Sequence, residues 1–111
     1  MSTVGDLARF YRALFTGGVY ADPATADVML TTVDGVQPLP GARPLGYRMG
    51  IWVVEIEGFT TYRHTGFFGT LATYVPELDL VVTAATNQNQ DEGALNKLAL
   101  EVIKVVAANR R

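Results

Sequence analysis

The residues with the clearest chemical content are His64-Thr65-Gly66, of which His64 ends a predicted strand. They place an imidazole, a hydroxyl and a glycine in succession, and a glycine lets a ligand approach the backbone closely. A purely structural interpretation stays open, in which His64 ends a strand, Thr65 and Gly66 form a bend, and Phe67 and Phe68 are core aromatic residues. A match of three residues does not decide between the two interpretations.

Other reactive residues are few. Ser2 is the only serine, and the two lysines, Lys97 and Lys104, both fall on a predicted C-terminal helix, so no activated nucleophile is recognisable. His64 is the only histidine and the carboxylates are scattered over turns and helix ends, which disfavours a metal site. The absence of cysteine excludes disulfides, thiolate metal ligands and a cysteine nucleophile. We therefore expect no metal and no other cofactor.

The composition indicates one ordered domain without a basic face. Of the 111 residues, 49% are hydrophobic and 18% are charged, which suits a chain with a buried core. Nine Lys and Arg against 11 Asp and Glu give a formal net charge of −2, which argues against nucleic-acid binding. The longest strongly apolar runs, 80–85 and 105–108, are far shorter than the ~20 residues that cross a bilayer, so we expect no membrane span.

The elements that must position these residues can be predicted from periodicity and turn signals. Helical spacing and capping residues predict short helices over 3–15 and 23–30, and a last helix over about 91–108. Strand-like segments occur at 47–56, 59–64, 70–75 and 80–86, whereas prolines and glycines predict a loop over 33–45. We expect a single α+β domain over 1–111. It would hold an antiparallel meander sheet of about four strands, two short N-terminal helices, and a C-terminal helix packed on one face.

The segment 80–85 predicts a further layer or a partner. Its side chains barely alternate, so they are apolar toward both faces of the sheet. The C-terminal helix can cover only one of these faces. The second layer could come from the N-terminal helices, from another copy of the chain, or from residues outside this sequence. Because an exposed apolar sheet is costly, we expect association with another copy, most simply as a homodimer.

The order of these segments resembles the C-terminal part of serine β-lactamase-like proteins, which include class C β-lactamases, D-alanyl-D-alanine carboxypeptidases and related esterases. The resemblance covers about residues 1–108 and is carried by Ser2-Thr3, the segment 6–10, Gly17-Gly18, Tyr47-x-Met49-Gly50-Ile51-Trp52, His64-Thr65-Gly66, the strand ending at Asn87 and the closing helix. In that family Ser-x-x-Lys provides nucleophile and base, Tyr-x-Asn or Ser-x-Asn relays protons, and Lys-Thr-Gly or His-Thr-Gly lies on a strand edge. Only the third motif occurs in this sequence.

The resemblance implies roles for five residues. His64 would replace the lysine of the third motif as the cation or proton relay, and Thr65 would hydrogen-bond a carboxylate or amide of the substrate. Gly66 would permit close approach, and the backbone N–H of Phe67 would be one of two oxyanion donors. Trp52 is assigned to substrate binding. It stands where some carboxypeptidases place an arginine for the substrate carboxylate, so the resemblance does not imply specificity for peptides.

By resemblance, we expect the chain to be the C-terminal part of a serine acyl-transferring hydrolase that is inactive alone. Its partners would be a small-molecule or peptide substrate and the absent N-terminal part of the parent. Such a parent would be bacterial and periplasmic or secreted, while the residues themselves leave the compartment open. The alternative is a non-catalytic α+β module that associates with itself. An in-frame Ser-x-x-Lys in the upstream coding sequence would favour the hydrolase.

Overall fold

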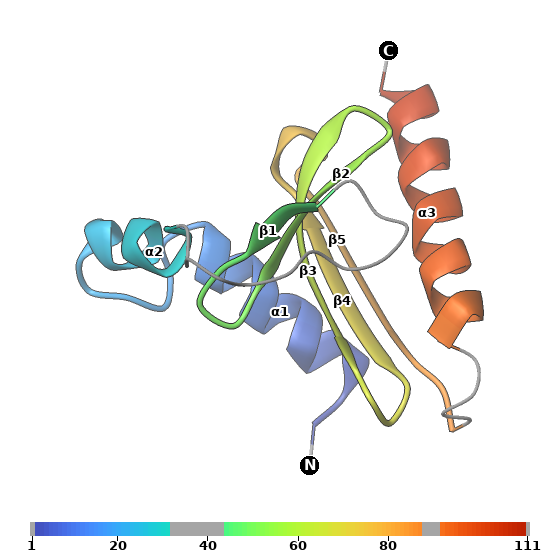
Figure 1. Cartoon of the computed structure of the whole chain (residues 1–111), viewed down its shortest axis with the longest axis horizontal. Helices are drawn as coiled ribbons and strands as arrows, with labels where there is room; N and C mark the ends of the chain where they lie inside the picture. Colours follow the sequence, from blue (N-terminus) through green and yellow to red (C-terminus); the bar gives the residue numbers. More distant parts are fainter. Residues whose placement is uncertain (1, 32–43, 88–91, 111) are drawn as a thin grey trace.

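A computed structural model describes residues 2–31, 44–87 and 92–110 of the chain. Within these ranges the chain forms three α-helices and one five-stranded antiparallel sheet (Figure 1). The elements are α1 (Val4–Phe15), α2 (Pro23–Met29), β1 (Pro44–Tyr47), β2 (Trp52–Ile56), β3 (Phe59–Gly66), β4 (Thr70–Val75), the 3-10 turn η1 (Pro76–Leu78), β5 (Leu80–Ala85) and α3 (Glu92–Asn109). The strands lie in the order in which they occur in the chain. The predicted α+β class and antiparallel meander are confirmed.

The strand β1 extends the sheet where the sequence predicts the end of a loop. The segment expected as one strand over 47–56 is divided by a turn, in which the Arg48 N–H donates to the Ile51 carbonyl at 2.7 Å. Gly50 lies in this turn at φ +79°, a conformation that favours glycine. Pro44 can begin β1 because an edge strand tolerates a residue without an N–H. The rest of the predicted loop, up to residue 43, lies outside the described residues.

The predicted starts of the first two helices are confirmed by their caps. The Asp6 N–H donates to Thr3 Oγ1 at 3.0 Å, and the Ala24 N–H donates to Asp22 Oδ1 at 3.0 Å ahead of the first turn of α2. These side chains satisfy backbone donors that have no partner within the helix. Helix starts were therefore readable from local sequence.

One face of the sheet is covered by α1 (Figure 1). Tyr11 of α1 is buried together with Ala72 and Tyr74 of β4. Phe15 of α1 stacks on Tyr62 and Tyr74, with ring centroids 4.9 and 5.3 Å apart. These aromatic contacts fix α1 across the middle of the sheet.

The opposite face is covered by α3 (Figure 1). Ile103 of α3 is buried in a cluster with Val75 at the end of β4 and Leu78 of η1. The predicted packing of the C-terminal helix on one face is confirmed. None of the helices in the described ranges is long and apolar enough to cross a membrane.

The position of the sheet between two helices corrects the argument for a missing layer. Both α1 and α3 contact β5, and they do so from opposite faces of the sheet. Val81 packs against the cluster beneath α1, whereas Leu80 packs against the cluster beneath α3. The apolar character of β5 toward both faces is thus explained by the chain's own helices. It no longer supports the expected homodimer.

Ile103 offers a test of the docking of α3. Its side chain is 0% exposed, so Ile103→Ala should lower the free energy of unfolding by about 3 kcal/mol through lost burial and a residual cavity. Val105 on the same helix is 60% exposed, and Val105→Ala should cost less than about 1 kcal/mol. Urea unfolding followed by circular dichroism measures both variants. Equal losses would contradict the described packing of α3.

Candidate functional site

The His64-Thr65-Gly66 segment ends β3 where one edge of that strand is open. β2 pairs with β3 only as far as Trp52 opposite Arg63, whereas β4 continues alongside β3 to Gly66. Along an antiparallel strand, the backbone N–H and C=O groups of successive residues point alternately toward the two neighbouring strands. Those of Thr65 point to the side on which β2 has already ended. No other described strand pairs there. Residues 64–66 therefore lie at an edge of β3 that none of the described strands covers.

The imidazole of His64 is exposed and is oriented by its own strand. Its Nδ1 lies 2.7 Å from the Thr65 carbonyl oxygen. Since a carbonyl oxygen only accepts, Nδ1 must donate, and in the neutral ring Nε2 carries the lone pair. The strand therefore selects which ring nitrogen can act as a base.

The candidate residues lie on two faces of the sheet. Side chains alternate along a strand, so His64 shares the α1 face with Tyr62, which packs in the cluster beneath α1. Thr65 shares the α3 face with Arg63, and Trp52 lies directly opposite Arg63 in the register. Trp52 and Thr65 are both half-buried. A ligand that contacts His64 as well as Thr65 must therefore lie against the open strand edge itself.

The turn after Gly66 corrects one structural interpretation. The Gly69 N–H donates to the Gly66 carbonyl at 3.0 Å, and Gly69 has φ +87°. Phe67 and Phe68 lie between them and are 73% and 80% exposed, so their interpretation as core aromatic residues is wrong. The hairpin carries them past the cover of both helices (Figure 1). Within the described residues no hydrogen bond engages the Phe67 N–H, so this donor is available to a ligand.

Arg63 was not singled out from the sequence, although it directly precedes the His64 motif. Its guanidinium donates to Asn96 Oδ1 of α3, and within the described ranges it forms no ion pair. Burial lowers the pKa of Arg63, because it removes a cation from water. The bond from β3 to α3 holds a cation on the same face as Trp52 and Thr65. Because side chains alternate along a strand, the sequence could have predicted that Arg63 shares this face with Thr65.

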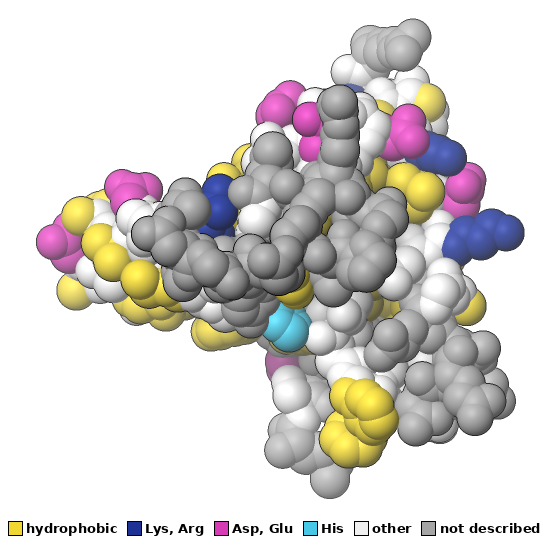
Figure 2. All heavy atoms as spheres, in the orientation of Figure 1, with side chains coloured by type: hydrophobic (Ala, Val, Ile, Leu, Met, Phe, Trp, Pro, Cys, Tyr) yellow, Lys and Arg dark blue, Asp and Glu magenta, His cyan; other side chains and the backbone are white. Residues whose placement is uncertain are grey.

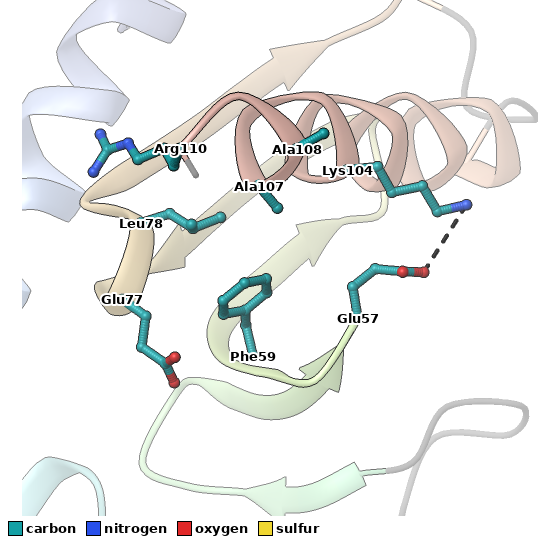
Figure 3. A pocket seen from close by; sticks show the side chains of 8 residues that line it. All are labelled: Glu57, Phe59, Glu77, Leu78, Lys104, Ala107, Ala108 and Arg110. Carbon is teal, nitrogen blue, oxygen red and sulfur yellow. Dashed lines mark ion pairs between the residues drawn. The ribbon is translucent and has the colours of Figure 1, made fainter.

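A separate cavity of about 540 Å³ lies near the end of α3 (Figure 3). It is lined by Glu57, Phe59, Glu77, Leu78, Lys104, Ala107, Ala108 and Arg110. Lys104 Nζ lies 3.9 Å from Glu57 Oε1, so these two charges offset one another. None of the predicted site residues lines this cavity. Among the described residues no group of three His, Asp or Glu is placed to hold a metal ion.

The contact between His64 and Thr65 predicts one tautomer of the imidazole. At a pH where the ring is neutral, long-range ¹H–¹⁵N NMR should show a protonated Nδ1 and an unprotonated Nε2, because the carbonyl needs a donor. N-acetyl-histidine amide in the same buffer provides the reference. A predominant Nε2–H form would contradict this orientation of the ring.

Gly69 should be intolerant of any side chain. A Cβ there would lie 2.7 Å from Thr86 Cγ2 and 2.8 Å from the Thr86 carbonyl, whereas a Cβ on Gly58 meets nothing within 4 Å at a similar φ of +83°. Both alanine variants incur the cost of a positive φ, so their difference isolates the clash. Gly69→Ala should lower the free energy of unfolding by about 1–2 kcal/mol more than Gly58→Ala. Urea denaturation measures the free energy of unfolding of both variants. Equal losses would show that the turn can accommodate a side chain at Gly69.

Comparison with known proteins assigns the chain to a family. The family model described as Beta-lactamase matches residues 1–107, which include α1, the whole sheet and most of α3. No curated protein and no solved structure matches the chain. The matched region contains the open edge of β3 and the turn beyond it. This protein belongs to the beta-lactamase family.

Proposed function

We propose that the chain provides the third active-site motif of a serine acyl-transferring hydrolase of the β-lactamase, D-alanyl peptidase or esterase type. The observation that carries this proposal is the position of His64-Thr65-Gly66 at the open edge of β3 in a chain of this family. The 111 residues contain no Ser-x-x-Lys, so the nucleophile and its base would come from outside them. The substrate would be a small molecule or a peptide with a reactive carbonyl.

The open edge offers the groups that such a reaction needs from this motif. The Phe67 N–H would donate to the oxyanion that forms when the carbonyl is attacked. The Thr65 hydroxyl would hydrogen-bond a carboxylate or amide of the substrate and fix its direction. Nε2 of His64 would move a proton to or from the leaving group. Trp52, on the same face as Thr65, would contact the substrate from the start of β2.

The competing proposal, a non-catalytic module that associates with itself, has lost its main support. It depended on an uncovered face of the sheet, and α1 covers that face. The hydrolase proposal depends on a strand edge and a turn instead, and both belong to the region that the family model matches.

The chain alone should not turn over a chromogenic cephalosporin or an activated ester. Without nucleophile and base, only binding and a single oxyanion donor remain. Absorbance assays against a buffer blank measure turnover, and intact-mass spectrometry detects acylation. Saturable turnover, or an acyl adduct on any residue other than Ser2, would contradict the proposal.

A binding experiment tests the proposed site directly. N-acetyl-D-alanine methyl ester, titrated into ¹⁵N-labelled chain, should shift the amide resonances of residues 65–67. Thr65→Val should weaken this binding about fivefold, the equivalent of ~1 kcal/mol for one hydrogen bond. Thr60→Val, near the other end of β3, is the matched control and should leave it unchanged. Resonances of 65–67 that do not move would refute the proposed site.

A further inference from the structure

The cavity near the end of α3 has no part in the proposed chemistry. It lies where the β2–β3 turn, η1 and the last turns of α3 meet (Figure 3). Phe59 lines it at the start of β3, whereas the His64 motif ends that strand. At about 3.3 Å per residue, the two places are roughly 20 Å apart. The cavity volume of about 540 Å³ suits a small molecule, so this is a separate candidate site.

The floor of the cavity is apolar and belongs to the core. Leu78 of η1 is buried in a cluster with Val75 and Ile103, and Phe59 and Ala107 pack against this cluster. Leu78, Phe59 and Ala107 also line the cavity. An apolar group placed against them would leave water, and residues held by the core need little ordering on binding. The floor therefore suits a ligand with an apolar body.

The rim of the cavity carries charges of both signs, of which only some are paired. Figure 3 shows Glu57 and Lys104 on one side of the cavity, where Lys104 Nζ lies 3.9 Å from Glu57 Oε1. Glu77 and Arg110 lie on the other side, and within the described residues neither of them forms an ion pair. Figure 2 shows acidic and basic side chains beside hydrophobic ones around the end of α3. One carboxylate and one guanidinium thus remain available to a ligand.

We propose that this cavity binds a zwitterion with an apolar body, either a free apolar amino acid or a short apolar peptide. The ammonium group of the ligand pairs with the Glu77 carboxylate. Its carboxylate accepts hydrogen bonds from the Arg110 guanidinium, whose planar fork matches two carboxylate oxygens. The apolar body lies against Phe59 and Leu78. A ligand with a charge of one sign only would leave Glu77 or Arg110 unmatched, which is why the rim favours a zwitterion.

A set of related ligands tests each part of this assignment. Leucyl-leucine, titrated into ¹⁵N-labelled chain, should shift the amide resonances of residues 57–59, 77–79 and 107–110. N-acetyl-leucyl-leucine lacks the ammonium group and leucyl-leucine amide lacks the carboxylate, so each should bind about threefold more weakly, as expected for an exposed ion pair. Glycyl-glycine keeps both charges without the apolar body and should not bind measurably. Comparison with free leucine shows whether an amino acid or a peptide is the better occupant.

Two charge variants connect these effects to individual side chains. Glu77→Gln should remove the threefold difference between the free and the acetylated peptide, and Arg110→Gln should remove the difference between the free peptide and its amide. Glu55→Gln changes an exposed carboxylate of β2 that does not line the cavity, and it should leave both ratios near three. Ratios of dissociation constants measured on one variant do not depend on its stability, provided that the variant is folded.

A steric variant tests the position of the ligand. Ala108 is exposed and lines the cavity, so Ala108→Phe should fill the space and prevent binding without disturbing the core. Ala94→Phe makes the same change at an exposed position near the start of α3 and should leave the affinity for leucyl-leucine unchanged.

Three results would overturn the assignment. These are unshifted resonances at 57–59, 77–79 and 107–110 with both leucine and leucyl-leucine, equal affinities for the free and the acetylated peptide, and undiminished binding to Ala108→Phe. The tests use resonances at the end of β3 that is remote from the His64 motif. Failure here would therefore leave the proposed hydrolase site unaffected.

Discussion

The burial of β4 on both faces is the constraint on which the rest of the structure depends. Residues 71–75 are all buried, with Ala72 and Tyr74 toward α1 and Leu71 and Val75 toward α3. Because removal of apolar surface from water is the main favourable contribution to folding, one strand requires cover from two sides. The helices that supply this cover come from the two ends of the described chain. Folding of the sheet therefore joins the beginning and the end of the chain to its middle.

A mismatch in strand length creates the candidate site. β3 has eight residues and β2 has five, and their tight turn at 57–58 pairs Ile56 with Phe59. β2 consequently reaches only as far as Arg63, and the last three residues of β3 extend past it. Backbone groups at such an edge can pair with an extended ligand as a neighbouring strand would. The open edge thus follows from unequal lengths of two paired strands.

The proposed chemistry lies on an exposed edge and turn, whereas the cavity near the end of α3 contains an ion pair and no predicted site residue. Acyl transfer benefits from exclusion of water, which strengthens the donors that stabilise an oxyanion. The groups of this chain would gain that benefit only when a second surface closes over the edge. Arg63 is already partly withdrawn from water, and its bond to Asn96 fixes the site end of β3 against α3.

The sequence by itself determined the features that depend on neighbouring residues. Helical spacing and capping signals predicted the first two helices, which Thr3 and Asp22 cap, and the His64 motif falls at the end of a strand. Only the tertiary structure decided which face α1 covers, that Arg63 meets Asn96, and that Phe67 and Phe68 point into solvent. These features depend on contacts between residues far apart in the chain. A local pattern shows that a side chain is apolar, but its burial depends on which distant element packs against it.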